Sequence, residues 1–498
     1  MKLGTLLEGV SVSKLFQTMF GQMVTTHDVE VGHLHYDSRK IGRGDAFVAI
    51  SGSTTDGHAF IQQALAQGAK VVVIERDDAI SDPQCMHTGV VKIVVSSTRK
   101  ALARMAANFY GRPADTMKIV GITGTNGKTT TTHIVRSILE AGGERAGLIG
   151  TIENRFGAIV EEATHTTPES LELHALFARM RQERCTAVSM EVSSHALDQS
   201  RVAGIAFACG VFTNLTQDHL DYHGTMEKYF AAKKALFEGL SPGEKAVINV
   251  DDQWGRHLAQ DTKVHAVTYG AAPDSTVRLL DASLSVDGSI LKIDVGGMTT
   301  TVTTPLPGRF NVSNVLAGYA TGIALGIPVP AIDLGIAAAD RVRGRFERVR
   351  SARGWTAIVD YAHTPDALEK CLSAIKDVLP KEQRGKIITV FGAGGDRDRT
   401  KRPKMGEVVS RMSDVTIVTS DNPRNEEPDK IIEDIVAGIH AEAVAHREPD
   451  RKKAIAMAAS MARPGDVILV AGKGHEDYQV IGREKRHFSD REEVEAVA

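Results

Sequence analysis

The sequence lacks the cysteine pattern of a protein stabilised by bound zinc or by disulfide bonds. Its 498 residues include only four cysteines, and none of them forms a C-x-x-C pair. They are Cys85, Cys185, Cys209 and Cys371. This spacing excludes a zinc ribbon and a disulfide scaffold. Scattered single cysteines are typical of a reducing compartment, so we expect a cytoplasmic protein.

An excess of positive charge is also lacking. The formal net charge is -3, from 59 basic and 62 acidic residues. A protein that binds nucleic acid needs a clear basic excess to neutralise phosphates, so we expect no nucleic-acid partner. Small anionic substrates are not excluded, because they need only a local group of cations.

Long apolar runs are scarce. Glu8 and Lys14 interrupt the N-terminal segment, which therefore lacks the apolar core of a secretory signal. Residues 312–332 carry no charge and resemble a membrane span in length. They contain several glycines and two prolines, however, which favour a buried helix followed by a turn. We therefore expect no membrane insertion.

What the sequence does contain is a repeated alternation of apolar strands and helices. Hydrophobic residues make up 42% and charged residues 24%, ordinary values for a globular protein whose length suggests two or three domains. The alternation predicts an α/β fold with mostly parallel sheets. We place three domains at residues 1–115, 116–343 and 344–498. The first is a small α/β unit, with strands expected at 46–50 and 70–75 and a helix at 60–69.

The second domain should be a P-loop, parallel-sheet domain of the ATPase type. KIVGIT is expected to be a strand, GTNGKT a turn, and the following segment a helix that stops at Gly142. Further strands and a helix follow in TAVSMEVS, ACGVFTNL, TMEKYFAAKKALFEGL and KAVINVD. Residues 277–304 are rich in β-branched residues and turns, which indicates a small portion of antiparallel hairpins.

The third domain should be Rossmann-like. Its four apolar strands lie in WTAIVDYA, KIITVFGAGG, DVTIVTSDNP and DVILVAGKG, and each runs into a loop rich in glycine or aspartate. Ligands of open α/β sheets bind outside the carboxyl ends of the strands. These four loops are therefore the expected place of a binding site.

The glycine-rich turn is the most specific signal. It consists of Gly124, Thr125, Asn126, Gly127, Lys128, Thr129 and Thr130. Glycines let backbone N–H groups approach a phosphate, Lys128 can reach the β- and γ-phosphates, and Thr129 can ligate Mg²⁺. The usual pattern has a glycine where this chain has Ile122, so the loop is a variant of the GTPase and ATPase form.

Acidic and histidine side chains at strand ends are candidate Mg²⁺ ligands. Glu191 closes an apolar strand, where a lone carboxylate is costly to bury unless it is paired or metal-bound. Asp218, His219 and Asp221 follow the next strand. Hard oxygen ligands suit Mg²⁺. Each residue taken singly is as readily a cap or a surface residue, and both interpretations stay open.

Lys233 interrupts an apolar helical stripe. Positions 226, 229, 230, 233, 236 and 237 share one helix face, and all but Lys233 are apolar or aromatic. Lys234 points away from this face. A lysine that extends its amine to solvent and a buried lysine with a chemical task fit this pattern equally well.

Six motifs in order resemble the Mur ligases. They are GTNGKTT, MEVSSHAL, NLTQDHLDYHG with AAKKALF, LPGRFNVSNVLAG, VDYAHTPDAL and DNPR, and the resemblance covers nearly the whole chain. It implies an ATP-dependent ligase of cell-wall peptidoglycan synthesis, with roles in cell shape and division. The implied reaction joins meso-diaminopimelate to UDP-N-acetylmuramoyl-L-alanyl-D-glutamate (UDP-MurNAc-L-Ala-D-Glu) through an acyl phosphate. We expect a monomer.

The resemblance also implies residue roles. The UDP-linked substrate would contact Ser38, the loop Ser53-Thr54-Thr55, Thr166, Thr167, Ser193, Gln199 and Arg201. ATP would bind the glycine-rich turn, with help from Asn314, Arg345 and Asp360. Mg²⁺ would be held by Thr129, Glu191, His219 and Lys233, with Lys233 converted by CO₂ to a carbamate. Lys128, Lys233, Glu191 and His219 would be catalytic. The amino acid would meet Arg397, Asp421, Asn422, Pro423, Arg424, Gly472 and Glu476.

Arg424 bears on the choice of amino acid. Its planar guanidinium can hold a carboxylate with two hydrogen bonds, and diaminopimelate has a second carboxylate that lysine lacks. The DNPR motif resembles the diaminopimelate-adding members of the family. Addition of lysine, a folylpolyglutamate-type reaction and a P-loop switch protein remain alternatives.

Overall fold

The computed structural model describes residues 1–52, 55–285, 288–340, 342–378 and 385–498. Its contacts divide the chain into two compact units. Unit 1 comprises Met1–Ile119 and Arg145–Phe207, and unit 2 comprises Val120–Glu144 and Ala208–Ala498. Of the predicted site residues, Ser53 and Thr54 lie outside the described residues.

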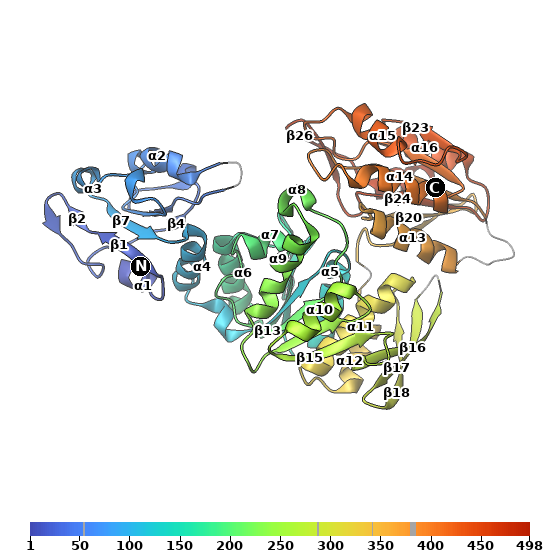
Figure 1. Cartoon of the computed structure of the whole chain (residues 1–498), viewed down its shortest axis with the longest axis horizontal. Helices are drawn as coiled ribbons and strands as arrows, with labels where there is room; N and C mark the ends of the chain where they lie inside the picture. Colours follow the sequence, from blue (N-terminus) through green and yellow to red (C-terminus); the bar gives the residue numbers. More distant parts are fainter. Residues whose placement is uncertain (53–54, 286–287, 341, 379–384) are drawn as a thin grey trace. The chain divides into compact units, whose positions relative to one another are not determined.

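Unit 1 begins with a five-stranded sheet in the order β1-β7-β6-β5-β4 (Figure 1). Its strands are β1 (Val12–Phe16), β4 (Leu34–His35), β5 (Ala46–Val48), β6 (Val71–Ile74) and β7 (Val91–Val95). β4 to β7 run parallel, and β1 pairs antiparallel with β7. Its helices are α1 (Leu3–Leu6), α2 (Ile61–Ala66), α3 (Asp82–Thr88) and α4 (Thr98–Phe109), and a small hairpin joins β2 (Thr18–Met19) to β3 (Gln22–Met23).

Every residue of β5, β6 and β7 is buried, as expected of parallel strands covered by helices on both faces. One buried cluster joins α1 and α4 to the sheet, and a second joins α2 and α3 to its other face. The predicted strands at 46–50 and 70–75 are confirmed with slightly shorter bounds. The predicted helix at 60–69 is present as α2, after a 3₁₀ turn at Gly57–Phe60.

The rest of unit 1 holds a second group of strands in the order β11-β10-β9-β12. These are β9 (Ala146–Ile149), β10 (Glu153–Phe156), β11 (Ile159–Glu162) and β12 (Ala187–Glu191), with helices α6 (Ser170–Gln182) and α7 (Ser194–Asp198). β9 and β12 are parallel, as predicted. The antiparallel hairpin of β10 and β11 is an addition that the sequence analysis missed. Its residues show no clean apolar alternation, because most are only partly buried.

The chain passes between the units within β8 (Lys118–Thr123), between Glu144 and Arg145, and within β13 (Phe207–Phe212). In unit 2, β13, β14 (Lys245–Asn249) and β15 (His265–Gly270) are parallel neighbours. The helices of this part are α5 (Lys128–Ala141), α8 (Leu220–His223), α9 (Met226–Glu238), α10 (Gln253–Asp261), α11 (Arg309–Ala324) and α12 (Val329–Ala337). The predicted strand, turn and helix around the glycine-rich loop are therefore present.

Residues 277–304 form the predicted antiparallel hairpins. They are β16 (Val277–Leu284), β17 (Ser289–Val295) and β18 (Met298–Thr304), and they continue the sheet beyond β15 (Figure 1). The uncharged stretch 312–332 lies in α11, a turn at Gly326 and the start of α12. α11 packs against α5, β14 and β15, so its apolar surface serves the protein core. No helix in the described part of the chain has the length and apolar composition needed to cross a bilayer.

The C-terminal part of unit 2 has a six-stranded sheet in the order β19-β20-β24-β21-β22-β23. The strands are β19 (Glu347–Arg350), β20 (Thr356–Asp360), β21 (Ile387–Phe391), β22 (Val415–Val418), β23 (Ala445–Arg447) and β24 (Val467–Ala471). The four predicted strands are its parallel centre. The edge strands β19 and β23, and the hairpin β25 (Tyr478–Ile481) to β26 (Glu484–His487), were not predicted.

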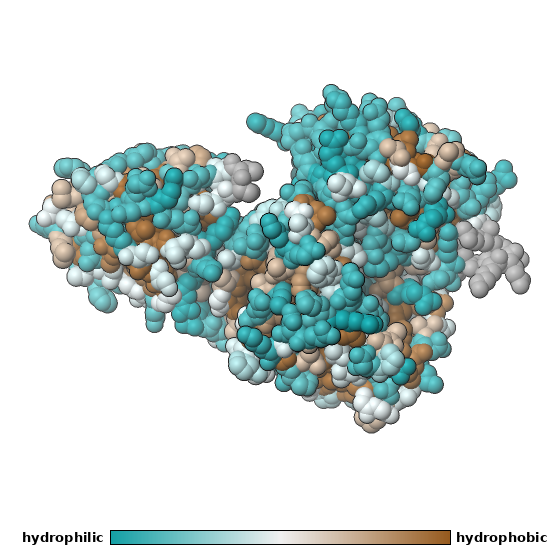
Figure 2. Space-filling view, in the orientation of Figure 1, coloured by the Kyte–Doolittle hydropathy of each residue, from teal (hydrophilic) through white to brown (hydrophobic). Residues whose placement is uncertain are grey.

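Helices cover both faces of this sheet, which makes it Rossmann-like. They are α13 (Pro365–Val378), α14 (Lys401–Met412), α15 (Pro428–Val436), α16 (Arg451–Met461) and α17 (Asp490–Val497). One buried cluster joins α13, α14 and α15 to the sheet, and the other joins α16 and α17. Figure 2 shows that hydrophilic residues cover most of the visible face of this part.

A buried histidine in α6 makes the stability of the fold sensitive to acid. His174 is 2% exposed, and neither ring nitrogen has a hydrogen-bond partner among the described residues. Burial lowers the pKa of His174 to about 4. As the pH falls from 6.5 to 4, the imidazole of His174 becomes protonated in the unfolded chain. In the native protein it becomes protonated only at lower pH. The native state should lose about 3 kcal/mol over this window.

We predict that His174→Leu reduces this loss. Chemical denaturation at pH 7.5 and pH 4.5 should show a smaller difference in unfolding free energy for the variant than for the unmodified protein. His165→Leu, at an exposed position, is the control and should leave the difference unchanged. An equal loss of unfolding free energy in acid for all three proteins would contradict the assignment of this loss to His174.

Candidate active site

The glycine-rich loop lies between β8 and α5 with the geometry of a phosphate-binding loop. Gly127 precedes the first turn of α5 with φ of 85°, and Thr129 and Thr130 are buried in that turn. The N–H groups of the first helical turn and the positive end of the helix dipole therefore point toward the loop. Lys128 donates through Nζ to the carbonyl oxygens of Gly124 and Thr125, at 3.0 and 2.9 Å.

Two glycines of the loop have no room for a side chain. A Cβ atom on Gly124 would lie 1.9 Å from Oγ1 of Thr213, and φ at Gly124 is 149°. A Cβ atom on Gly127 would lie 2.4 Å from Oδ1 of Asn314. The variant loop thus places its glycines where the residue after β13 and helix α11 approach its backbone closely.

Lys233 lies beneath this loop. It is 1% exposed, its Nζ donates to the carbonyl oxygen of Gly124 at 2.8 Å, and it lies 4.6 Å from the ring centre of Tyr229. Burial, together with the nearby charge of Lys128, holds the pKa of Lys233 well below its usual range. The interpretation of Lys233 as a lysine that extends to solvent is wrong. Lys234 does point away, and pairs with Asp261 at 2.8 Å.

Asp218 is the centre of a second buried group. Its carboxylate is close to His219, His363 and Lys401, at 3.4, 3.7 and 3.4 Å. Burial alone would raise the pKa of Asp218, but Lys401 and the two histidines hold it well below the usual value. Asp218 is therefore ionised. Asp221, the other candidate in this segment, is exposed.

Arg345 extends from the segment before β19 to the first turn of α5. Its Nη2 donates to Oγ1 of Thr129 at 3.0 Å, and its guanidinium lies 4.7 Å from the ring centre of Tyr361. Asp360 accepts hydrogen bonds from the backbone of Phe346 and Ala362, at 2.6 and 2.8 Å. Burial raises the pKa of Asp360. Asp360 thus orients the backbone next to Arg345.

Asn314 connects the loop with a cavity beside Arg345. Asn314 donates through Nδ2 to Oδ1 of Asn311 at 3.0 Å. Asn311 lines a cavity of about 220 Å³ that is also bounded by Leu306, Arg345 and Phe346. Arg345 therefore contacts both the phosphate loop and a cavity with apolar and cationic walls, while Asn314 reaches that cavity only through Asn311.

Five of the predicted substrate residues gather around Glu191 in unit 1. Glu191 is fully buried and accepts from the N–H and Oγ1 of Thr151, at 2.7 and 3.0 Å. Further hydrogen bonds run from Thr151 to Thr166, from Thr167 to the backbone of Glu191, from the N–H of Ser193 to Thr167, and from Arg201 to Thr167 and Gln199. Ser38, which follows β4, instead donates to Gln63 at 3.0 Å.

The predicted amino-acid residues also cluster, at the carboxyl ends of β21, β22 and β24. Asn422 donates to Glu476 at 2.8 Å, and a Cβ atom on Gly472 would lie 3.0 Å from Oδ2 of Asp421. Arg424 donates to the carbonyl oxygen of Gly395 at 2.8 Å. Burial and the nearby charge of Arg397 lower the pKa of Arg424, so the two cations are neighbours.

Sequence reasoning missed Lys473, which holds this cluster together. Its side chain is fully buried, and its Nζ lies 3.4 Å from Asp421, 3.1 Å from Asn422 and 3.4 Å from Glu476. Burial alone would raise the pKa of Asp421, but Lys473 and Arg451 lower it. Burial and Asp421 raise the pKa of Glu476. The sequence could have indicated Lys473 as a site residue, because the GKGHE segment follows β24 at the same sheet edge.

Two further supports of this cluster come from residues distant in the sequence. Arg451 and Asp490 form a fully buried pair, with Arg451 also donating to the carbonyl oxygens of Ala471 and Ser420. Gln479 and Val480 of β25 donate to the backbone and side chain of the Asp421–Asn422 segment. No local pattern indicates such contacts.

Profiles of three domains match the chain in order. They are the catalytic domain of the Mur ligase family at residues 30–110, the Mur ligase middle domain at 122–322, and the glutamate ligase domain of Mur ligases at 344–474. The matched segments contain the glycine-rich loop and the Asp421–Arg424 segment.

Curated relatives match over nearly their whole length. A protein of Geobacter metallireducens named UDP-N-acetylmuramoyl-L-alanyl-D-glutamate--2,6-diaminopimelate ligase is 46% identical over 497 residues, 94% of each chain. A protein of the same name from Bacillus velezensis is 42% identical and covers 97% of this chain and 98% of its own.

Solved structures share the fold. One, titled as the structure of UDP-N-acetylmuramoyl-L-alanyl-D-glutamate--2,6-diaminopimelate ligase, is 31% identical, covers 95% of this chain and 96% of its own, and has a TM-score of 0.66. MurF ligase from Thermotoga maritima, solved with ADP, is 21% identical, with 89% and 94% coverage and a TM-score of 0.63. The mixed α/β, three-domain architecture is that of these ligases. The chain belongs to the Mur ligase family and is an ATP-dependent ligase that forms amide bonds.

Proposed function

We propose that this protein adds meso-diaminopimelate to the D-glutamate of UDP-MurNAc-L-Ala-D-Glu, in the synthesis of the peptidoglycan precursor. The proposal is carried by the Asp421–Arg424 segment, whose cations and acids cluster at one sheet edge. Relatives that share 42–46% of the sequence and bear the name of this reaction support it. The four described cysteines are free and buried, which suits a cytoplasmic protein.

The reaction proceeds in two steps. The side-chain carboxylate of D-glutamate attacks the γ-phosphorus of ATP, which forms an acyl phosphate and releases ADP. The amine of the amino acid then attacks the acyl carbon, the amide forms, and inorganic phosphate leaves with loss of the ammonium proton. Little covalent chemistry falls to the protein, so its contribution is positioning and charge neutralisation.

Lys128 and the loop backbone bind the phosphates of ATP. The ammonium of Lys128 exchanges its bonds to the carbonyl oxygens of Gly124 and Thr125 for phosphate oxygens. Arg345 brings a second cation to Thr129. Asn314 packs against the loop from α11, and Asp360, at the end of β20, orients the backbone next to Arg345.

Each of the residues Thr129, Glu191, His219 and Lys233 would offer Mg²⁺ a suitable ligand atom. A hydroxyl and a buried carboxylate are hard oxygen ligands, and a carbamate on Lys233 adds another. Bound Mg²⁺ supplies positive charge against the transferring phosphoryl group. The ionised Asp218 lies beside His219 and orients that imidazole.

The Lys233 amine is suited to react with CO₂. Its lowered pKa makes the neutral, nucleophilic form of the amine easier to reach. The nitrogen attacks the carbon of CO₂, an N–C bond forms, and one proton is released as the carbamate anion appears. This converts a buried amine into an anionic oxygen ligand next to the phosphate loop.

The amino-acid site matches diaminopimelate in charge. Arg424 and Arg397 are cations for its carboxylates, with Pro423 fixing the turn before Arg424. Asp421, Asn422 and Glu476 offer acceptors for an ammonium group. Gly472 keeps the approach to Asp421 open. Lysine would leave Arg424 without a carboxylate partner.

The UDP-linked substrate binds through unit 1. The hydrogen-bonded group of Thr166, Thr167, Ser193, Gln199 and Arg201 presents hydroxyl, amide and guanidinium donors. These suit the peptide and carboxylate portions of the substrate. Ser38 and Thr55 serve the uridine portion.

The first prediction concerns the acceptor. Phosphate release from ATP with UDP-MurNAc-L-Ala-D-Glu should require meso-diaminopimelate and should be at least about a hundredfold slower with L-lysine, because the partly buried guanidinium of Arg424 would then lack a carboxylate partner. Arg424→Lys should reduce the ratio of the rate with meso-diaminopimelate to the rate with L-lysine. Arg399→Lys, the control at an exposed position, should leave this ratio unchanged. Equal rates with lysine would overturn the assignment of the amino acid.

The second prediction concerns Lys233. Incubation with ¹³C-bicarbonate should give a carbamate signal in the ¹³C NMR spectrum that is lost in Lys233→Met. Ligase activity should fall by about a thousandfold or more in this variant. Lys234→Met, one position along the helix and facing away, should retain both signal and activity. A signal that persists without Lys233 would contradict the proposal.

The third prediction concerns Lys473. Lys473→Met leaves Asp421 and Glu476 without their shared cation, so KM for the amino acid should rise by at least about tenfold while KM for ATP stays near its original value. Lys485→Met removes an exposed lysine above the Tyr478 ring and should change neither constant. If both KM values rise together, Lys473 supports the whole domain and not the amino-acid site.

A further inference from the structure

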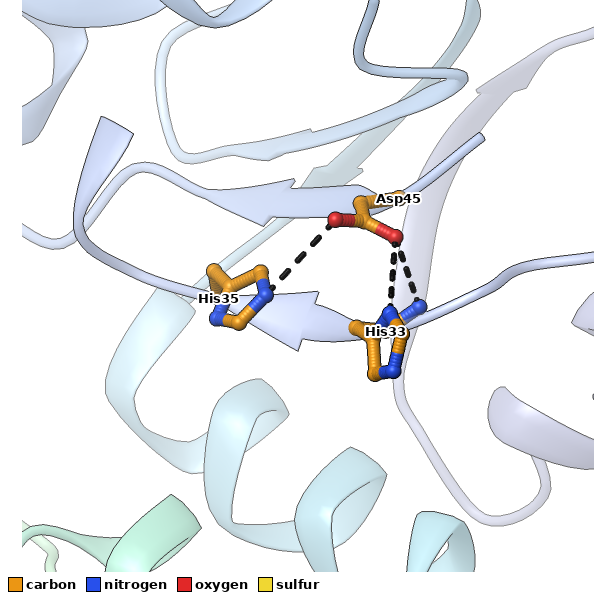
Figure 3. A group of neighbouring side chains, drawn as sticks. All are labelled: His33, His35 and Asp45. Carbon is orange, nitrogen blue, oxygen red and sulfur yellow. Dashed lines mark hydrogen bonds and ion pairs between the residues drawn. The ribbon is translucent and has the colours of Figure 1, made fainter. Parts of the chain in front are cut away.

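Two histidines and an aspartate meet at the edge of the five-stranded sheet in unit 1 (Figure 3). His33 and His35 are two positions apart at β4, so their side chains leave the same face of the strand. Asp45 directly precedes β5, the parallel neighbour of β4. None of these residues belongs to the proposed ligase site.

The distances between the three side chains match those between ligands of one metal ion. Nδ1 of His33 lies 3.3 Å from Oδ1 of Asp45, and Nε2 of His35 lies 3.6 Å from Oδ2. The three ligand atoms all lie within 4.8 Å of one another. Ligands at about 2.0–2.1 Å from a tetrahedral ion are roughly 3.3 Å apart, which is close to the separation of each histidine nitrogen from Asp45.

The backbone holds the Asp45 carboxylate in place. Oδ1 accepts from the N–H of His33 and Oδ2 accepts from the N–H of Gly42, both at 2.8 Å. A Cβ atom on Gly32 would lie 2.8 Å from Oδ1, so a larger residue there would push the carboxylate away. Each oxygen keeps a lone pair for a further ligand. These bonds supply the outer support that metal-binding carboxylates usually have.

Exposure allows an ion to enter. The side chain of Asp45 is 6% exposed, while those of His35 and His33 are 23% and 73% exposed. The buried carboxylate forms the floor of the site and the His33 ring lies at its solvent side. Water can complete the coordination from that side.

We propose that His33, His35 and Asp45 form a binding site for a transition-metal ion of the Zn²⁺ or Co²⁺ type. Two imidazole nitrogens and one carboxylate suit these ions, whereas Mg²⁺ prefers oxygen ligands. The ion joins the short edge strand β4 to β5. Ser38 follows His35 by three residues, so the ion also fixes the segment that carries this proposed uridine contact.

The test is a titration of the full-length protein with Co²⁺, in excess Mg²⁺ and without nucleotide. Co²⁺ bound to imidazole ligands has a visible absorption that reports its coordination directly. The double variant His33→Ala/His35→Ala should lose the visible absorption of Co²⁺ bound to these two imidazoles. Its affinity for Co²⁺ at this site should be at least about tenfold weaker, so the titration should count one bound metal ion fewer. His87→Ala, an exposed histidine on α3, should behave as the unmodified protein.

Thermal unfolding with Zn²⁺ separates metal binding from misfolding. Without added metal, His33→Ala should unfold at the same temperature as the unmodified protein, because the His33 side chain is mostly exposed. Zn²⁺ should raise the unfolding temperature of the unmodified protein more than that of His33→Ala. An unchanged Co²⁺ spectrum and an equal Zn²⁺ effect in the variants would show that the group is only an ion-paired cluster and overturn the proposal.

Discussion

The hydrogen bond from the buried amine of Lys233 to the carbonyl oxygen of Gly124 is the interaction on which the phosphate-loop part of unit 2 depends. It places a titratable nitrogen under the phosphate loop, where water cannot stabilise a positive charge. Burial and Lys128 therefore keep the pKa of this amine low. The glycines of the loop allow the close approach, because a side chain at either Gly124 or Gly127 would collide with β13 or α11.

The C-terminal part also buries a lysine, but there the buried cation is compensated by nearby partners. Lys473 is also fully buried, but it is surrounded by Asp421, Asn422 and Glu476, so it has the partners that a buried cation needs. Lys401 stands in the same relation to Asp218. One buried lysine thus lacks a carboxylate partner among the described contacts of unit 2 and is suited to chemistry, while the other two organise acids around a site.

Much of the candidate site was predictable because parallel strands end at one edge of a sheet. Glu191, Asp218, Asp421 and Gly472 all follow apolar strands, and a local pattern of apolar residues followed by polar or glycine residues is visible without a structure. Lys233 was visible for a related reason, since it breaks an apolar helical stripe. What the pattern could not decide was its environment: only the packing of α9 under the loop distinguishes a buried amine from one that reaches solvent.

The sequence by itself determined the α/β class, the phosphate loop, the four central strands of the C-terminal sheet and most side chains expected at the strand ends, because these follow from local periodicity and motif spacing. Only the tertiary structure decided the burial of Lys473 among Asp421, Asn422 and Glu476, the support from Arg451, Asp490 and β25, and the meeting of His33 and His35 with Asp45. The reason is that these contacts join residues whose separation in the chain leaves no periodic signal. Their energies depend on burial and on distances of a few ångströms, which exist only once the sheets and helices have packed.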